Sequence, residues 1–143
     1  MKKLNLNKVF PKPTSVGKRN WGKEDLLVLI PKVLSFKKIF IKKGSKGGLQ
    51  YHRLKNECGY LVSGKLKVSF DLGDGKLRNK VLKKGDIFHF SPGTIHQEEA
   101  LTNCVIIEAS SPHFNDRVRV EKKYGLKVNG GLKSTKLNEV IKK

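Results

Sequence analysis

Two short stretches of the chain carry polar side chains of the kinds that bind divalent metal ions. The first contains Gln50, His52 and Glu57 between two glycines, and the second contains His96 shortly after a Pro-Gly pair. Divalent transition metals prefer imidazole nitrogen and carboxylate oxygen as ligands, and the amide of Gln50 can add a neutral oxygen. These four residues are therefore candidate ligands of one metal ion. A hydrogen-bonded polar cluster without metal could use the same residues, so the pattern leaves both interpretations open.

A metal site of this composition could perform two kinds of chemistry. The ion could act as a Lewis acid on substrate oxygen atoms, and the neutral amide of Gln50 favours zinc for that role, with iron, manganese or nickel as alternatives. Without Gln50, the remaining His52, Glu57 and His96 have the two-His-one-carboxylate composition of non-haem iron oxygenases. The presence of Gln50 favours the Lewis-acid interpretation.

The segments that must position these residues have the pattern of short strands. Apolar and polar residues alternate over 65–70, and apolar runs bounded by turn residues predict further strands at 26–30, 33–41, 49–52, 58–63, 77–82, 87–90, 95–100 and 105–110. Such regular spacing predicts an all-β sandwich or barrel. Because side chains alternate along a strand, Gln50 and His52 can face the same interior. Neighbouring segments can bring in Glu57 and His96.

The order and spacing of these residues resemble the two sequence motifs of the cupin superfamily. Residues 44–64 fit G-x5-H-x-H-x3,4-E-x6-G, with Gln50 in place of the first His. Residues from 85 onward fit G-x5-P-x-G-x2-H-x3-N, with Ser91 in place of Pro and Ala100 in place of Asn. The resemblance implies a single jelly-roll β-barrel over residues 21–126. Residues 1–20 and a basic tail over 127–143 would flank it. We expect 1–20 to form an arm in which Pro11 and Pro13 prevent a helix, and which could pack along a sheet edge or reach a partner subunit.

Within the superfamily, the Gln-His-Glu-His set is similar to that of the type II phosphomannose isomerases, which bind their metal through these residue types. Further similarities are Trp21-Gly22, Phe36-Lys37-Lys38-Ile39, Ile107-Glu108-Ala109, Asp116-Arg117-Val118-Arg119 and Tyr124-Gly125. The resemblance implies a metal-dependent sugar or sugar phosphate isomerase or epimerase, in which the metal polarises the C1 and C2 oxygens. A barrel without the other domains of larger isomerases could instead bind a sugar without converting it.

An isomerase of this kind needs a general base to move a proton between two carbons. Glu108 is one candidate, since a carboxylate in an apolar strand must be paired, face the cavity or face solvent. His89 is a second, although an imidazole there could equally lie in the wall or on the sheet surface. His113 is a third, in a segment that could fold over the barrel mouth. The resemblance gives Arg119 a role in substrate binding or proton transfer.

The formal net charge of +19 allows three interpretations: attraction of nucleic acid, attraction of anionic metabolites, or a lysine-rich proteome. The sequence contains no nucleic-acid-binding motif and no interleaving of aromatic and basic residues, so it does not favour specific nucleic-acid binding. Phosphorylated sugars are also anions, and a positive field would raise their rate of capture.

The remaining expectations concern location and assembly. No apolar run approaches the roughly 18 residues of a membrane span, and none follows the basic N-terminus. Cys58 and Cys104 form no CxxC pair, so we expect reduced thiols in a cytoplasmic protein. The resemblance to single cupin barrels implies a homodimer formed through edge strands. Residues 134–143 could form a short amphipathic helix capped by Ser134, or a loose tail.

Overall fold

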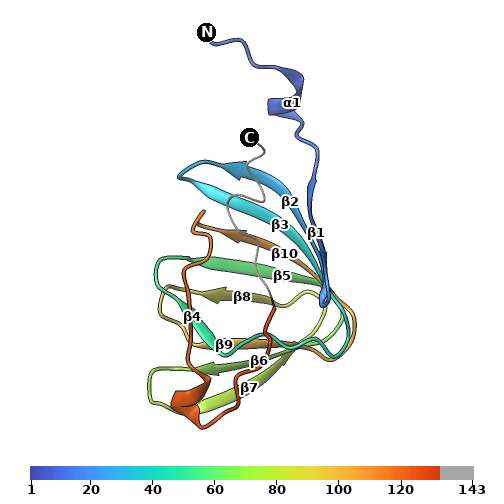
Figure 1. Ribbon diagram of the computed structural model, residues 1–143. Coiled ribbons are helices and arrows are strands. Elements are labelled where there is room, and N and C mark those ends of the chain that lie inside the picture. The colour runs from blue at the N-terminus through green and yellow to red at the C-terminus, as the bar shows by residue number, and fades with distance from the viewer. Residues whose placement is uncertain (133–143) are drawn as a thin grey trace.

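The computed structural model describes residues 1–132, apart from the side chains of 16–18, and consists of two facing antiparallel sheets (Figure 1). The first sheet has the order β1-β2-β3-β10-β5-β8 and the second has the order β11-β4-β9-β6-β7. The strands are β1 Thr14–Arg19, β2 Gly22–Ile30, β3 Leu34–Ile41, β4 Gln50–His52, β5 Glu57–Ser63, β6 Leu66–Asp71, β7 Leu77–Leu82, β8 Ile87–Phe90, β9 His96–Ala100, β10 Cys104–Ser110 and β11 Arg117–Arg119. This arrangement confirms the expected all-β jelly-roll fold.

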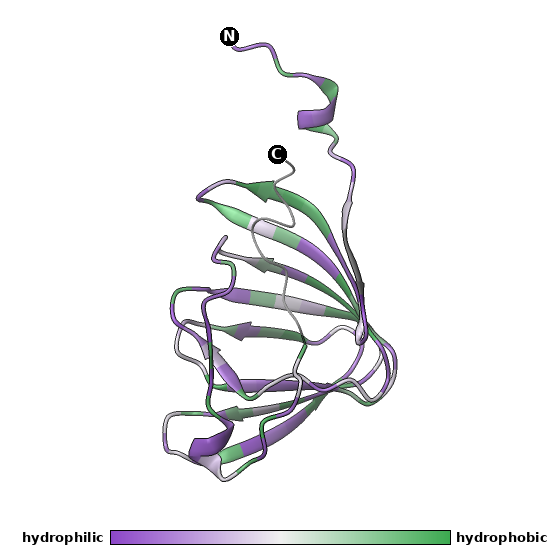
Figure 2. Cartoon of the chain, in the orientation of Figure 1, coloured by the Kyte–Doolittle hydropathy of each residue, from purple (hydrophilic) through white to green (hydrophobic). Residues whose placement is uncertain are grey.

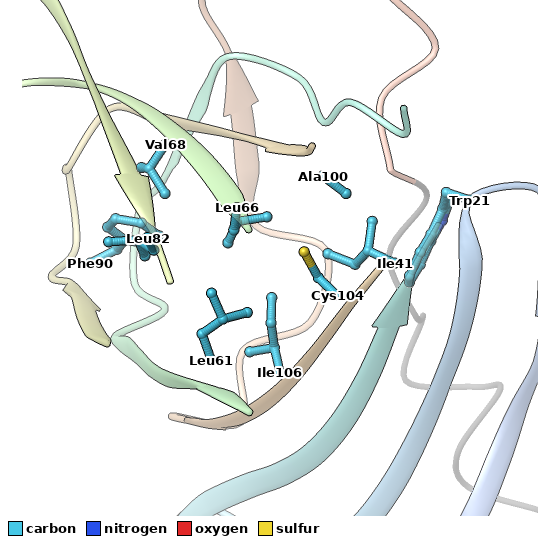
Figure 3. Close-up of a cluster of buried hydrophobic side chains, with 10 residues drawn as sticks. All are labelled: Trp21, Ile41, Leu61, Leu66, Val68, Leu82, Phe90, Ala100, Cys104 and Ile106. Carbon is cyan, nitrogen blue, oxygen red and sulfur yellow. The ribbon is translucent and has the colours of Figure 1, made fainter. Parts of the chain in front are cut away.

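The interior between the sheets is apolar at one end and polar at the other. Inward-facing residues of β10 change from Cys104 and Ile106 to Glu108 along the strand. In the same way, the ribbon of β5 begins hydrophilic and becomes hydrophobic further along (Figure 2). The apolar end forms the core drawn in Figure 3, which consists of Trp21, Ile41, Leu61, Leu66, Val68, Leu82, Phe90, Ala100, Cys104 and Ile106. The polar end remains available for a site.

The N-terminal segment partly contradicts the sequence-based expectation. We expected Pro11 and Pro13 to prevent a helix in residues 1–20, yet a short helix, α1 (Leu6–Val9), is present. It ends before Pro11, and the side chain of Asn5 caps it by accepting a hydrogen bond from Lys8 N at 2.9 Å. β1 then pairs antiparallel with β2 at the edge of the six-stranded sheet, which confirms that the arm packs along a sheet edge.

Two further segments complete the described chain. A 3₁₀ turn, η1 (Glu121–Tyr124), follows β11, and Gly125 ends it in the left-handed conformation. None of the helices within residues 1–132 has the length and hydropathy that crossing a membrane would require. The helix expected at 134–143 lies outside the described residues.

Gly22 is expected to be essential for the start of β2. Its φ of 149° is rare for other residues, and a Cβ there would lie 1.9 Å from the main-chain oxygen of Phe40. We predict that Gly22→Ala lowers the free energy of unfolding by roughly 2–4 kcal/mol, because backbone atoms must move. Gly73→Ala is the matched control and should cost about 1–2 kcal/mol, because Gly73 has φ of 102° and no atom of residues 1–132 would lie within 4 Å of the added Cβ. Urea denaturation followed by Trp21 fluorescence measures both, and equal losses would contradict this explanation.

Candidate metal centre

Three potential ligands converge at the polar end of the barrel. His52 ends β4, Glu57 begins β5 and His96 begins β9, and one ligand atom from each lies within 4.8 Å of the other two. Glu57 Oε1 is 3.6 Å from His52 Nε2 and 3.3 Å from His96 Nε2. Because metal–ligand bonds of about 2.1 Å place neighbouring ligands about 3.4 Å apart in a tetrahedral site, these separations suit a shared ion.

Both imidazole rings are oriented by a hydrogen bond from the nitrogen that faces away from Glu57. His52 Nδ1 contacts Asp116 Oδ1 at 3.1 Å, and His96 Nδ1 donates to the main-chain oxygen of Thr94 at 2.9 Å. The ring of Phe90 also stacks on His96, with the centroids 4.0 Å apart. These contacts direct each Nε2 toward Glu57 Oε1, where a shared metal ion would bind, and they are the outer-shell support usual for metal-ligating histidines.

Gln50 lies in the same cavity wall as the three converging residues. It precedes His52 by two positions in β4 and pairs with His96 in the β4–β9 ladder. Its Oε1 is buried and accepts no hydrogen bond from any residue in 1–132. A buried acceptor without a donor is unfavourable, so a cation beside Gln50 would supply the missing interaction. The donor set and this unpartnered oxygen together fit a divalent metal.

Lys55 holds the other oxygen of Glu57. Its Nζ lies 2.6 Å from Glu57 Oε2 and 3.1 Å from Glu108 Oε1. Burial alone would raise the pKa of Glu57, but Lys55, His96 and His52 together hold it well below its usual value. Burial raises the pKa of Glu108 despite the attraction of Lys55. Glu57 is therefore kept ionised with one oxygen directed toward the histidines.

The converging residues line a cavity of about 100 Å³. The other charged residues in its wall are Glu24, Lys37, Lys55, Glu98, Glu108 and Arg117. Glu98 follows His96 by two positions in β9, so both side chains face the same side of the sheet. Burial and the negative charge of Glu57 raise the pKa of Glu98 to about 7. Within the described part of the chain, no hydrogen bond or ion pair involves its carboxylate.

The structure brings some of the predicted catalytic residues to the cavity and not others. Glu108 lines it, whereas His89, His113 and Arg119 do not. His89 is exposed and hydrogen-bonds Asn56 at 2.7 Å, because its position in β8 alternates with that of the buried Phe90.

The other two predicted residues have partners elsewhere. Nδ1 of the exposed His113 contacts Ser111 Oγ at 2.8 Å. Arg119 donates from Nε to the buried Glu121 at 2.7 Å, and its Nη2 donates to the main-chain oxygen of Asn129 at 2.9 Å. Arg119 is thus engaged with Glu121 and Asn129 outside the cavity wall. Arg117, two positions earlier in β11, lines the cavity instead.

Comparison with known proteins establishes the family. Residues 38–113 match the family model of the cupin domain, and this match covers more than half of the chain. The protein therefore belongs to the cupin family. A search of curated proteins found no match.

Several solved structures have a similar fold. The capsular polysaccharide assembling protein CapF from Staphylococcus aureus superposes with a TM-score of 0.66 at 20% identity, over 76% of this chain and 32% of CapF. An RmlC-like cupin from Shewanella frigidimarina gives 0.60 at 25% identity, over 81% and 96% of the two chains. Bacillus subtilis oxalate decarboxylase, whose structure contains Mn(II) centres, gives 0.60 at 19% identity, over 73% and 29%. This chain thus spans about one third of the length of CapF, and these similarities establish the fold without specifying an isomerase.

The raised pKa of Glu98 predicts how stability depends on pH in the metal-free protein. Because its pKa rises from 4.5 to about 7 on folding, the folded state binds more protons between these values, and its contribution to stability is lost as pH rises through that window. Glu98→Gln removes this loss, so the variant should gain on the order of 2–3 kcal/mol relative to wild type between pH 4.5 and pH 8. Urea unfolding in chelator checks this, and parallel pH profiles would contradict it.

Proposed function

We propose that this cupin binds one divalent metal ion through Gln50, His52, Glu57 and His96 and isomerises or epimerises a small sugar or sugar phosphate. The observation that carries the proposal is the convergence of three ligand atoms within 4.8 Å, in a cavity whose wall also carries Gln50 with its unpartnered oxygen. An amide, two imidazoles and a carboxylate suit a redox-silent Lewis acid, and zinc is our first choice. The Mn(II) centres of the oxalate decarboxylase neighbour make manganese the second.

A metal bound there would polarise substrate oxygens and stabilise the negative charge that develops on them. The chain's own residues have separate tasks. His52 and His96 are oriented by Asp116 and by the Thr94 carbonyl, and Lys55 holds Glu57. We assign proton transfer to Glu98 because its side chain lines the cavity from the strand that carries His96.

The size of the cavity limits how the substrate binds. Its volume of about 100 Å³ lies below the roughly 300–1,000 Å³ of sites that enclose a whole drug-sized ligand. The cavity therefore encloses the reacting end of the substrate, and the remainder extends toward the barrel mouth. This arrangement suits a linear aldose or ketose that presents its first two carbons to the metal.

A non-haem iron oxygenase is the second candidate. It is favoured by the composition of the His52, Glu57 and His96 cluster, which has the two-His-one-carboxylate set without needing Gln50. Iron in the purified protein together with oxygen uptake would support this candidate. Turnover that is unchanged under anaerobic conditions would exclude it in favour of the isomerase.

Metal content tests the site itself. We predict about one divalent ion per chain by elemental analysis after dialysis, and less than about one tenth of that in His96→Ala, because loss of one of the four ligands weakens binding severely. His89→Ala is the matched control, since His89 is exposed on β8 and lies away from the cavity wall. A wild-type protein that retains no zinc, manganese or iron would contradict the proposal.

Substitution of Glu98 tests the assigned proton transfer. Glu98→Gln should lower kcat for interconversion of mannose 6-phosphate and fructose 6-phosphate at least about 100-fold while the metal content stays unchanged. Glu99→Gln is the control, because Glu99 faces the other side of β9 and lies 3.9 Å from Lys46. Full activity of the Glu98→Gln variant would show that Glu98 does not transfer the proton. If the metal-loaded wild type does not turn over these substrates, this isomerase activity is excluded.

A further inference from the structure

We propose that Arg117 forms an anion-binding subsite in this cavity, so that the ligand carries a carboxylate or phosphate group close to the metal. The inference builds on the proposed function and specifies the charge of its substrate. The sequence placed Arg117 in a segment similar to the isomerases but gave it no role, and the role proposed here follows from its position and from the pairing of the charges around it.

Arg117 is a direct neighbour of a metal ligand. In the β11–β4 ladder its Cα pairs with that of His52, and both residues line the cavity. Directly opposed residues of antiparallel strands have Cβ atoms about 4.5–5.5 Å apart and project to the same face. The long side chain of Arg117 can therefore reach a group on a ligand that is bound beside His52.

The other cations in the cavity wall are already paired with carboxylates. Lys37 Nζ lies 2.9 Å from Glu24 Oε1, and Lys55 contacts Glu57 and Glu108. Arg119, on the same face of β11 as Arg117, is paired with Glu121. These ion pairs compensate each buried charge within the protein and leave those cations little capacity for a ligand.

Arg117 differs from these cations in the partners of its charged group. Across residues 1–132, its guanidinium makes one hydrogen bond, from Nη1 to the main-chain oxygen of Leu132 at 2.7 Å, and it contacts no carboxylate. A guanidinium has five N–H donors, so four of them are available. Burial and the nearby charge of Arg119 lower the pKa of Arg117, and no acidic group within residues 1–132 offsets them. A ligand anion would supply the compensation that the described residues do not.

Trp21 gives independent support for a ligand rich in oxygen acceptors. Its side chain lines the same cavity, and the residue is only 9% exposed. Its indole N–H is buried without a hydrogen-bond acceptor in the part of the chain that the structure describes. The indole nitrogen can only donate, so it needs an acceptor such as a ligand oxygen. Trp21 and Arg117 thus offer donors to the same cavity.

The guanidinium geometry defines the chemical class of the ligand. Its planar fork donates two parallel hydrogen bonds to the paired oxygens of a carboxylate or phosphate. The net charge of +19 would also raise the local concentration of such anions. We therefore expect a sugar acid or sugar phosphate whose anionic group lies at the β11 side of the cavity. Neutral sugars would leave Arg117 uncompensated.

Titration calorimetry with two anionic probes tests the subsite. Zinc-loaded and metal-free protein are titrated with inorganic phosphate and with glycolate, and ethylene glycol serves as the neutral probe. Arg117→Met should weaken binding of the preferred anion by about 10-fold or more, because charge-assisted hydrogen bonds are lost. Arg53→Met is the matched control, since Arg53 is exposed beside His52 and does not line the cavity, and it should change affinity less than about 2-fold. The tighter-binding probe identifies the carboxylate or the phosphate as the recognised group.

Equal weakening by the two Met variants, or a wild type that binds neither anion, would overturn the subsite. Arg117→Lys keeps the charge without the planar fork, so it provides a second test, with an intermediate loss expected, if the Met variant does not fold. Binding needs no turnover, so the two proposals can fail separately. Binding that depends on Arg117 without isomerase activity supports the subsite alone, and isomerase activity without such binding refutes the subsite alone.

Discussion

The site depends on the carboxylate of Glu57, whose burial would be energetically unfavourable without the cations around it. Glu57 lies at the start of β5, where burial opposes its negative charge, and Lys55 compensates that charge through one of its oxygens. The other oxygen faces His52 and His96, so a metal ion there would complete its coordination. The neighbouring polar contacts hold these side chains in position, as the hydrogen bond from His52 to Asp116 does.

The jelly roll makes such a site possible because it separates the two halves of its interior. Inward-facing residues of β5, β9 and β10 are apolar at one end and acidic or imidazole-bearing at the other. The apolar end supplies the stabilising core, so the polar end can hold charges that do not contribute to packing. Hydrogen-bonded sheets on both sides of the cavity can hold ligands in a fixed geometry, which metal binding and transition-state stabilisation both require.

Strand alternation and turn residues are local signals, so the sequence was enough to predict the barrel and the convergence of His52, Glu57 and His96. It gave no role to Lys55 or Arg117, because their roles depend on which cations find carboxylate partners in the folded chain. The sequence could have placed Glu98 in the cavity, because it follows His96 by two positions in a strand and must therefore face the same side. The pairing of Arg119 with the buried Glu121 could not be predicted, because nothing in the linear sequence shows that contact.

X-ray absorption spectroscopy of the metal-loaded protein, combined with anomalous diffraction from its crystals, tests the central claim most directly. The account predicts one ion within about 2.0–2.2 Å of Nε2 of His52 and His96 and of one oxygen each from Glu57 and Gln50. An ion bound elsewhere on the chain, or crystals grown with excess metal in which these four side chains only hydrogen-bond one another, would contradict it.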